Sequence, residues 1–283
     1  MIYHISSNLN YLGPMSSAHF PSIYIPHGGG PCFFMDWTRG PAYTWDTMKA
    51  WLQNLHKILP RKPKAILVIS AHWEEDVIKI NSQPHPPLYF DYYGFPPHTY
   101  ELTYPAPGSP ELAEQIQTLL HNADIESALD PDHGYDHGTF VPLKVMFPDA
   151  DIPVVQVSLQ RDLDPAYHVQ VGAALQSLRE QDILILGSGM SFHNMDTLMR
   201  GQDIGNHAAT FDNWLTSTCE SEPKERNKLL GNWLNAPSAQ QSHPREEHLL
   251  PLMVVAGAGG SDLGKNIFKD NVMGVNVSAY QFG

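Results

Sequence analysis

The sequence predicts an α/β protein, a single domain with a central mixed, largely parallel sheet flanked by helices. Three observations support this class. Short β-branched runs bounded by chain breakers alternate with amphipathic helical patterns along most of the chain. Several of these runs are apolar on both faces, as in central strands that helices cover on each side. The pattern has no linker long enough to divide the 283 residues into two domains.

The predicted strands are short, apolar and rich in β-branched residues. Residues 65–70, for example, have the sequence AILVIS, and residues 183–186 have the sequence ILIL. A last pair of strands is expected to close the chain. The predicted strands are 22–26, 65–70, 77–81, 154–158 and 183–186, with the closing pair near 272–277 and 278–282.

Helices are predicted where apolar residues recur with helical spacing. Between residues 48 and 59 the apolar residues lie at intervals of three and four, and Pro60 ends the pattern. The pairs Ser109–Pro110 and Asp164–Pro165 each combine an N-cap residue with a proline in the first turn, so each is expected to begin a helix. Further helices are predicted over residues 207–218 and 246–256.

The charge balance argues against anionic partners. Seventeen Lys and Arg against thirty Asp and Glu give a net charge of −13, which repels phosphate backbones and anionic lipid. We therefore expect neither nucleic acid nor a membrane as a partner. The first residues have no basic start and no apolar block of the kind found in signal peptides, so a cytoplasmic protein is expected. The sequence leaves the oligomeric state open.

Three of the fifteen histidines follow predicted strands. His27 comes directly after the strand 22–26, His72 lies two residues beyond the strand 65–70, and His193 follows the strand 183–186 through a glycine-containing turn. In open α/β sheets, ligands bind outside the carboxyl ends of the strands. The sequence therefore places an active site at that edge and predicts that these three imidazoles converge there.

Two further histidines have carboxylates beside them. His137 follows Asp136, which either orients the imidazole or caps a helix. His248 follows Glu246 and Glu247, whose charges also suit a helix start. Imidazole and carboxylate donors suit zinc, iron or copper, and two or three histidine ligands leave coordination positions open for a substrate. These residues predict an open metal site.

Eight motifs, taken together and in order, carry a resemblance to a known family. They cover nearly the whole chain from about residue 20. The motifs are PHGG (26–29), SAHW (70–73), YGFP (93–96), YPAPGS (104–109), DHGTF (136–140), FPDADIPV (147–154), GSG with HN (187–189 and 193–194) and EHLLPL (247–252). The chain resembles the class III extradiol ring-cleavage dioxygenases, specifically the DOPA 4,5-dioxygenase-like subgroup.

This resemblance implies a mononuclear non-haem Fe(II) enzyme that opens the ring of a catechol such as DOPA with O2 and gives a semialdehyde acid. Zn(II) is a possible occupant of the purified protein, because zinc outcompetes ferrous iron at nitrogen and oxygen sites. The implied partners are a small aromatic diol and O2. The implied organisation is an N-terminal extension over residues 1–20 and a catalytic domain over residues 21–283.

The resemblance also implies the metal ligands. His27 and His72 would be two of them. His248 would be the third, at the place where the wider family uses a carboxylate. Glu246 or Glu247 is the alternative, which would restore the two-histidine, one-carboxylate set of other non-haem oxygenases.

The remaining roles implied by the resemblance concern the substrate. His193 matches the catalytic base of the wider family and is also a candidate fourth ligand. His137 would form a hydrogen bond with the bound oxygen or with a substrate hydroxyl. From the aromatic, proline-rich segment, Tyr92, Tyr93 and Phe95 are candidate contacts to the substrate ring.

Two other functions fit the same residues. The first is a zinc-dependent hydrolase, in which the histidines hold a metal that activates water. The second is a binding protein on the same fold that recognises phosphopeptides. Such a protein needs a cluster of arginines near the cleft, and the seven arginines of this chain are widely spread.

Overall fold

Within residues 19–283, which the computed structural model describes, eight strands form one mixed sheet in the order β4-β3-β5-β2-β6-β1-β8-β7. The central strands β5, β2, β6 and β1 are parallel to one another, and antiparallel pairing begins at β3 on one side and at β8 on the other. The predicted mixed, largely parallel sheet is confirmed. The strands are β1 (Ser22–Pro26), β2 (Ala65–Glu75), β3 (Ile78–Asn81), β4 (Ser127–Asp130), β5 (Val154–Gln160), β6 (Ile183–Gly189), β7 (Gly264–Val272) and β8 (Val275–Phe282).

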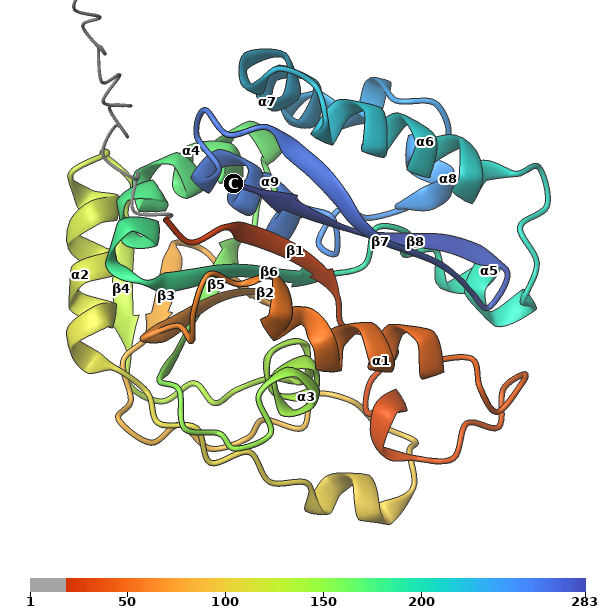
Figure 1. Ribbon diagram of the computed structural model, residues 1–283, viewed down its shortest axis with the longest axis horizontal. Helices are drawn as coiled ribbons and strands as arrows, with labels where there is room; N and C mark the ends of the chain where they lie inside the picture. The colour runs from red at the N-terminus through yellow and green to blue at the C-terminus, as the bar shows by residue number, and fades with distance from the viewer. Residues whose placement is uncertain (1–18) are drawn as a thin grey trace, which may run out of the picture.

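Helices cover both faces of the sheet (Figure 1). Helices α1 and α3 lie on one face, and α4, α6, α7 and α9 lie on the other. The α-helices are α1 (Asp46–Asn54), α2 (Pro110–His121), α3 (His137–Met146), α4 (Pro165–Leu175), α5 (Met195–Arg200), α6 (His207–Cys219), α7 (Pro223–Gly231), α8 (Ala239–Ser242) and α9 (Leu250–Ala258). Short 3-10 helices cover Cys32–Phe34, Leu55–Ile58, Pro97–Glu101, Gln176–Gln181 and Trp233–Asn235.

The central strands separate two hydrophobic cores. In β2, Leu67 and Ile69 pack into the core beneath α4 and α9, whereas Ile66 and Val68 pack into the core beneath α1 and α3. Successive side chains of a strand point to opposite faces, so a run that is apolar at every position fills both cores. This arrangement confirms the reading of these runs as central strands and makes the sheet a fixed support for the residues at its edge.

Two predicted helix starts are confirmed by their caps. The Ser109 hydroxyl accepts a hydrogen bond from the Leu112 backbone N–H at 3.3 Å and begins α2. The Asp164 carboxylate accepts from the backbone N–H of Ala166 at 2.8 Å and begins α4. Each cap satisfies a backbone donor that has no partner within the helix.

Two predicted boundaries were wrong in ways that affect the site. Strand β2 continues five residues beyond the predicted end, so His72 lies inside the strand; a register shift between Ile69 and Glu74 allows this extension. Helix α9 begins at Leu250 rather than at residue 246. The segment 246–248 therefore lies in the turn that precedes the helix.

The closing pair of strands was also placed wrongly. Strands β7 and β8 form an antiparallel hairpin whose turn is Met273–Gly274, and both turn residues have positive φ (52° and 84°). This is the backbone that a tight two-residue hairpin requires. Strand β7 was missed because its sequence, GKNIFKDNV, is polar, which is typical of an edge strand. The four-residue strand β4 was not predicted either.

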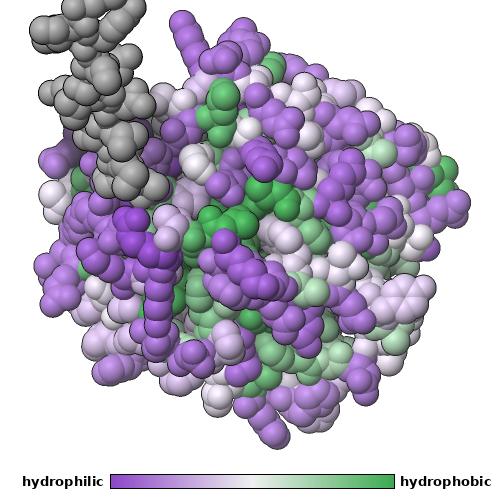
Figure 2. Space-filling model, viewed as in Figure 1, coloured by the Kyte–Doolittle hydropathy of each residue, from purple (hydrophilic) through white to green (hydrophobic). Residues whose placement is uncertain are grey.

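The surface carries mostly polar side chains on the face seen in Figure 2. Figure 2 shows one face that is mostly hydrophilic, with apolar side chains gathered in a band across its middle. None of the helices in residues 19–283 is long and apolar enough to cross a membrane. Of the expected N-terminal extension, residues 1–18 lie outside the described part of the chain.

Candidate active site

Five histidines from five separate segments meet at the carboxyl ends of the central strands. His27 directly follows β1, His72 lies in the extended end of β2, and His193 follows β6. His137 is the first residue of α3, and His248 lies two residues before α9. Because β1, β2 and β6 are parallel neighbours, their carboxyl ends place these side chains together although the chain separates them widely.

Three of the imidazoles form a set that fits a metal ion. The Nε2 atoms of His27 and His72 lie 3.2 Å apart, and one ring nitrogen from each of His27, His72 and His248 lies within 4.8 Å of the others. Two imidazole nitrogens on one tetrahedral metal, each about 2.1 Å from it, lie about 3.4 Å apart. The spacing between His27 and His72 therefore suits a shared divalent ion, and His248 lies near enough to be a third ligand.

The electrostatics of these three imidazoles also suit a metal. Burial lowers the pKa of His27, of His72 and of His248 well below its ordinary value, because it disfavours the charged form, and neighbouring imidazoles lower each pKa further. A neutral imidazole keeps a lone pair for a metal, whereas an imidazolium does not. The set is thus neutral and ready to donate at physiological pH.

Hydrogen bonds fix which nitrogen of two of these rings is free. Ser188 donates its hydroxyl proton to the carbonyl oxygen of Gly138, so its oxygen accepts the proton of His27 Nδ1, 3.0 Å away. Likewise, Glu247 accepts from His248 Nδ1 at 2.8 Å. Both rings therefore carry the proton on Nδ1 and present an unprotonated Nε2.

Asp91 orients His137, and sequence reasoning missed it. Its carboxylate accepts hydrogen bonds from His137 Nδ1 at 2.7 Å and from the His137 backbone N–H at 2.9 Å. Burial raises the pKa of Asp91, but the hydrogen bonds and charge of His137 outweigh it and lower the pKa overall. A lone carboxylate in the aromatic run 88–95 was the available signal. Asp91, His72 and His137 form a second possible donor set.

Glu247 supports two imidazoles at once. Its Oε1 atom lies 2.8 Å from His248 Nδ1 and 3.2 Å from His193 Nδ1, and the two rings stack with centroids 3.4 Å apart. Burial raises the pKa of Glu247, but the hydrogen bond from His193 and the charge of Arg245 lower it overall. These three residues form a third donor set. Glu246 belongs to none of the sets within residues 19–283.

Asp136 was expected either to orient His137 or to cap a helix. In the structure it is the N-cap residue of α3. Its carboxylate accepts hydrogen bonds from the Thr139 backbone N–H at 3.1 Å, from Ser70 Oγ at 2.7 Å and from the amide of Gln156. Burial, reinforced by the charge of Asp91, raises the pKa of Asp136 to about 6. This network joins α3 to β2 and β5 and holds His137 at the start of the helix.

A cavity of about 210 Å³ opens onto the five histidines. Apart from them its walls are mainly apolar, and Phe95, a candidate contact to the substrate ring, is one of the lining residues. An apolar cavity of about 150 Å³ is enough to hold benzene, so one aromatic ring fits here. Tyr92 stands behind His137, with ring centroids 5.8 Å apart, and Tyr93 is 89% exposed; neither lines the cavity.

We expect the Asp91→Asn substitution to slow turnover by about 10- to 100-fold, the usual effect of losing a residue that orients a ligand or catalytic imidazole. An amide offers one acceptor where the carboxylate offers two, so one of the two bonds to His137 is lost or the ring turns. Steady-state turnover and bound metal are measured against Asp149→Asn, an exposed carboxylate elsewhere. Equal rates in both variants would contradict the orienting role of Asp91.

Comparisons with known proteins agree with this geometry. The family model described as the catalytic LigB subunit of aromatic ring-opening dioxygenase matches residues 17–282. A 4,5-DOPA dioxygenase extradiol from Beta vulgaris is 42% identical over 218 residues, which cover 76% of this chain and 79% of that protein. The protein of the same name from Escherichia coli K12 is 36% identical, covering 86% of this chain and 87% of its own.

Two further relatives cover more of the chain. Dioxygenase tasH from Hapsidospora irregularis is 34% identical over 93% of this chain and 85% of its own length. The crystal structure of an uncharacterized protein from Escherichia coli K12 superposes with a TM-score of 0.74 at 30% identity, covering 93% of this chain and all of that one. The chain therefore belongs to the LigB family of aromatic ring-opening dioxygenases and is a class III extradiol dioxygenase of the DOPA 4,5-dioxygenase-like subgroup.

Proposed function

We propose that this enzyme opens the ring of a catechol such as DOPA beside the diol, inserts both atoms of O2 and releases a semialdehyde acid, with Fe(II) as its metal. One observation carries the proposal: three imidazoles that could hold one metal ion line a mainly apolar cavity that has room for a single aromatic ring. Relatives named as 4,5-DOPA dioxygenases support the choice of catechol. Zn(II) is expected as an adventitious occupant.

His27, His72 and His248 would hold the metal through one nitrogen each. Bound Fe(II) would supply open positions for both catechol oxygens and O2 and would lower the pKa of the first phenol. Hydrogen bonds to Ser188 and Glu247 orient two of these three rings, His27 and His248, before a metal would bind.

His193 is the base in this proposal. Its Nδ1 proton is directed at the Glu247 carboxylate, so Nε2 is left to accept the second phenol proton of the catechol. The carboxylate then stabilises the imidazolium that forms. Stacking on His248 keeps the ring against the metal site, and the ring lines the cavity.

In this proposal His137 contacts the substrate or the bound oxygen. Asp91 binds its Nδ1 proton, and the ring packs 3.9 Å from that of His72, measured between centroids. The ring lines the cavity, where it is placed to form a hydrogen bond with a substrate hydroxyl or with bound oxygen.

The test is oxygen uptake. The purified enzyme is stripped of metal, loaded anaerobically with Fe(II) and mixed with DOPA in oxygenated buffer. We expect one O2 consumed per yellow ring-fission product and, with ¹⁸O2, both labelled atoms in that product. Fe(II)-loaded enzyme that consumes no O2 with DOPA or with a panel of other catechols would contradict the proposal. Hydrolysis without O2 uptake would identify a metal-dependent hydrolase.

A further inference from the structure

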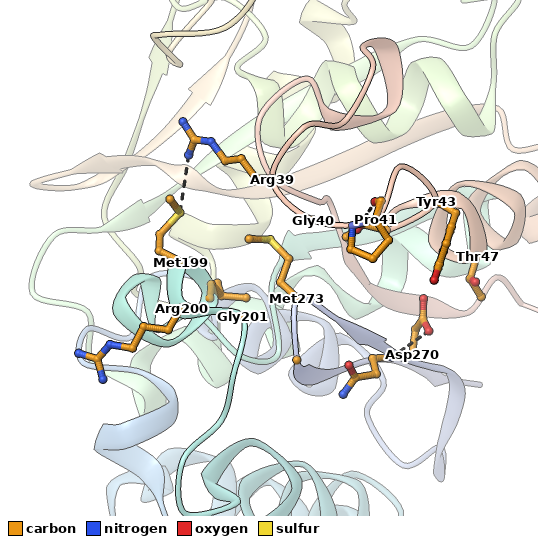
Figure 3. A pocket seen from close by; sticks show the side chains of 14 residues that line it. Arg39, Gly40, Pro41, Tyr43, Thr47, Met199, Arg200, Gly201, Asp270 and Met273 are labelled. Carbon is orange, nitrogen blue, oxygen red and sulfur yellow. Dashed lines mark hydrogen bonds between the residues drawn. The ribbon is translucent and has the colours of Figure 1, made fainter.

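A second, larger pocket adjoins the cavity that contains the histidines. This outer pocket has a volume of about 710 Å³ and lies between the loop that contains Arg39 and Tyr43, the end of α5 and the hairpin of β7 and β8 (Figure 3). Four residues line both spaces: Arg39, Leu198, Met199 and Met273. The two spaces therefore meet at a boundary formed by these side chains.

We propose that the outer pocket binds an anionic substituent carried on the ring of the substrate, and that Arg39 is the residue that selects for its charge. This inference rests on the proposed function, because it requires the catechol ring to occupy the cavity that contains the histidines, called the inner cavity below. It assigns a role in specificity, and Arg39 takes no part in the chemistry of ring opening.

Size is the first argument. The inner cavity, at about 210 Å³, has room for one ring and little more. A substituent on that ring must pass the boundary at Arg39, Met199 and Met273, beyond which about 710 Å³ is available. The boundary side chains are mostly long and flexible, so a substituent can pass between them without a backbone change.

Charge is the second argument. Among residues 19–283, Arg39 is the one ionisable side chain besides the histidines that lines the inner cavity, in a protein whose net charge is −13. The ion pairs found within residues 19–283 do not include it. Its guanidinium donates to Met199 Sδ at 3.6 Å, and sulfur is a weak acceptor. A carboxylate would offer two strong acceptors in a geometry that matches the guanidinium.

The position of Arg39 is fixed by its loop. Trp37 Nε1 donates to the carbonyl oxygen of Arg39 at 2.8 Å, and the Trp37 ring packs edge-on against Trp45 with centroids 5.3 Å apart. The Thr44 hydroxyl donates to the carbonyl oxygen of Pro41 at 2.6 Å. A loop held in this way orders the arginine backbone before the ligand binds, which lowers the entropic cost of binding.

The charged side chains of the outer pocket are distributed unevenly around it. In Figure 3, Arg39 and Met199 point toward one another, whereas Arg200 points away from them. Asp270 lies beside Tyr43, away from Arg39. Asp270 would repel a carboxylate and the Arg39 guanidinium would attract it. The electrostatic potential therefore favours an anion at the Arg39 end of the pocket.

The test compares two catechols that differ in one charge: 3-(3,4-dihydroxyphenyl)propanoate and its N-methyl amide. In the Arg39→Met variant we expect KM for the carboxylate to rise by about 10-fold or more, in line with the loss of a charged hydrogen bond. The KM of the amide and both kcat values should stay within about twofold, since no group that contacts the diol is altered. Arg39→Lys should restore part of the preference because it keeps the charge.

Two control variants define the origin of the effect. Arg161→Met removes the same charge at an exposed position that pairs with Asp76, and it should leave the preference unchanged. Arg200→Met tests the neighbouring cation of the outer pocket. An equal rise in KM for both catechols in the Arg39→Met variant would overturn the proposal. Loss of the preference in Arg200→Met but not in Arg39→Met would also overturn it.

Calorimetric binding separates this inference from the proposed function. The dissociation constants of both compounds are measured for the Zn(II)-loaded wild-type and Arg39→Met proteins, without turnover. Tighter binding of the carboxylate that disappears in Arg39→Met supports the inference even if no ring opens. Ring opening without any preference between the two compounds supports the proposed function and overturns the inference. Binding of neither compound overturns the inference.

Discussion

Replacing His72 with alanine is expected to abolish metal binding and ring opening together. His72 belongs to two of the three donor sets, one with His27 and His248 and the other with Asp91 and His137. Its loss therefore breaks both sets, whichever of them holds the ion. The fall in metal affinity should exceed the roughly 10- to 100-fold that the loss of a supporting hydrogen bond costs. Metal content after dialysis and O2 uptake are the measurements.

Variants at two other histidines complete this experiment. His85→Ala removes an exposed imidazole and should retain both metal and activity. His248→Ala distinguishes the two sets, because it breaks the one with His27 and leaves the one with Asp91 intact. Full metal occupancy in a folded His72→Ala protein, confirmed by circular dichroism, would leave only the set of His193, Glu247 and His248 and would overturn the assignment of His72.

Replacing His193 with alanine is expected to leave most of the metal in place and to slow turnover by roughly 10²–10⁴, the span for loss of a general base. The set of His27, His72 and His248 does not include this ring, so its removal leaves three donors. The side chain is 21% exposed, so added imidazole has access to the space left by the ring and should restore part of the rate.

The control for this variant is His98→Ala, which removes an exposed imidazole that forms a hydrogen bond with the carbonyl oxygen of Phe34. It should neither lose activity nor respond to imidazole. Loss of metal from His193→Ala would instead make His193 a ligand, and His137 would then be the next candidate for the base. An unchanged rate with full metal occupancy would exclude both roles for His193.

The convergence of the histidines was predictable because it depends on a rule about strand ends. His27 and His193 follow buried apolar runs that can be recognised locally, and parallel strands bring their carboxyl ends to one edge. His72 was assigned to the same edge although its strand extends further than predicted. The continuation AHWEE mixes apolar and polar residues, and a register shift lets it stay paired to β5.

The supporting residues were harder to predict because their contacts join distant parts of the chain. Asp91 lies in a segment without regular structure and reaches His137 across 46 residues of sequence. Arg39 lies in an exposed loop whose position depends on the packing of Trp37 against Trp45. The sequence around Asp91 or Arg39 contains no pattern from which the residues that it contacts could be predicted. The edge strand β7 was missed for a related reason: its stability comes from pairing with β8 rather than from apolar residues of its own.

A metal site built from His27, His72 and His248, as proposed above, would link the supply of metal to the lifetime of the protein, because these residues are widely separated along the chain. No short peptide contains this trio, so an unfolded chain offers the ion no comparable binding place, and the ion favours the native state by mass action. A free concentration one hundred times the dissociation constant adds about 2.7 kcal/mol to the free energy of unfolding. Without a bound metal ion, the enzyme would unfold more often and proteases would degrade it more readily.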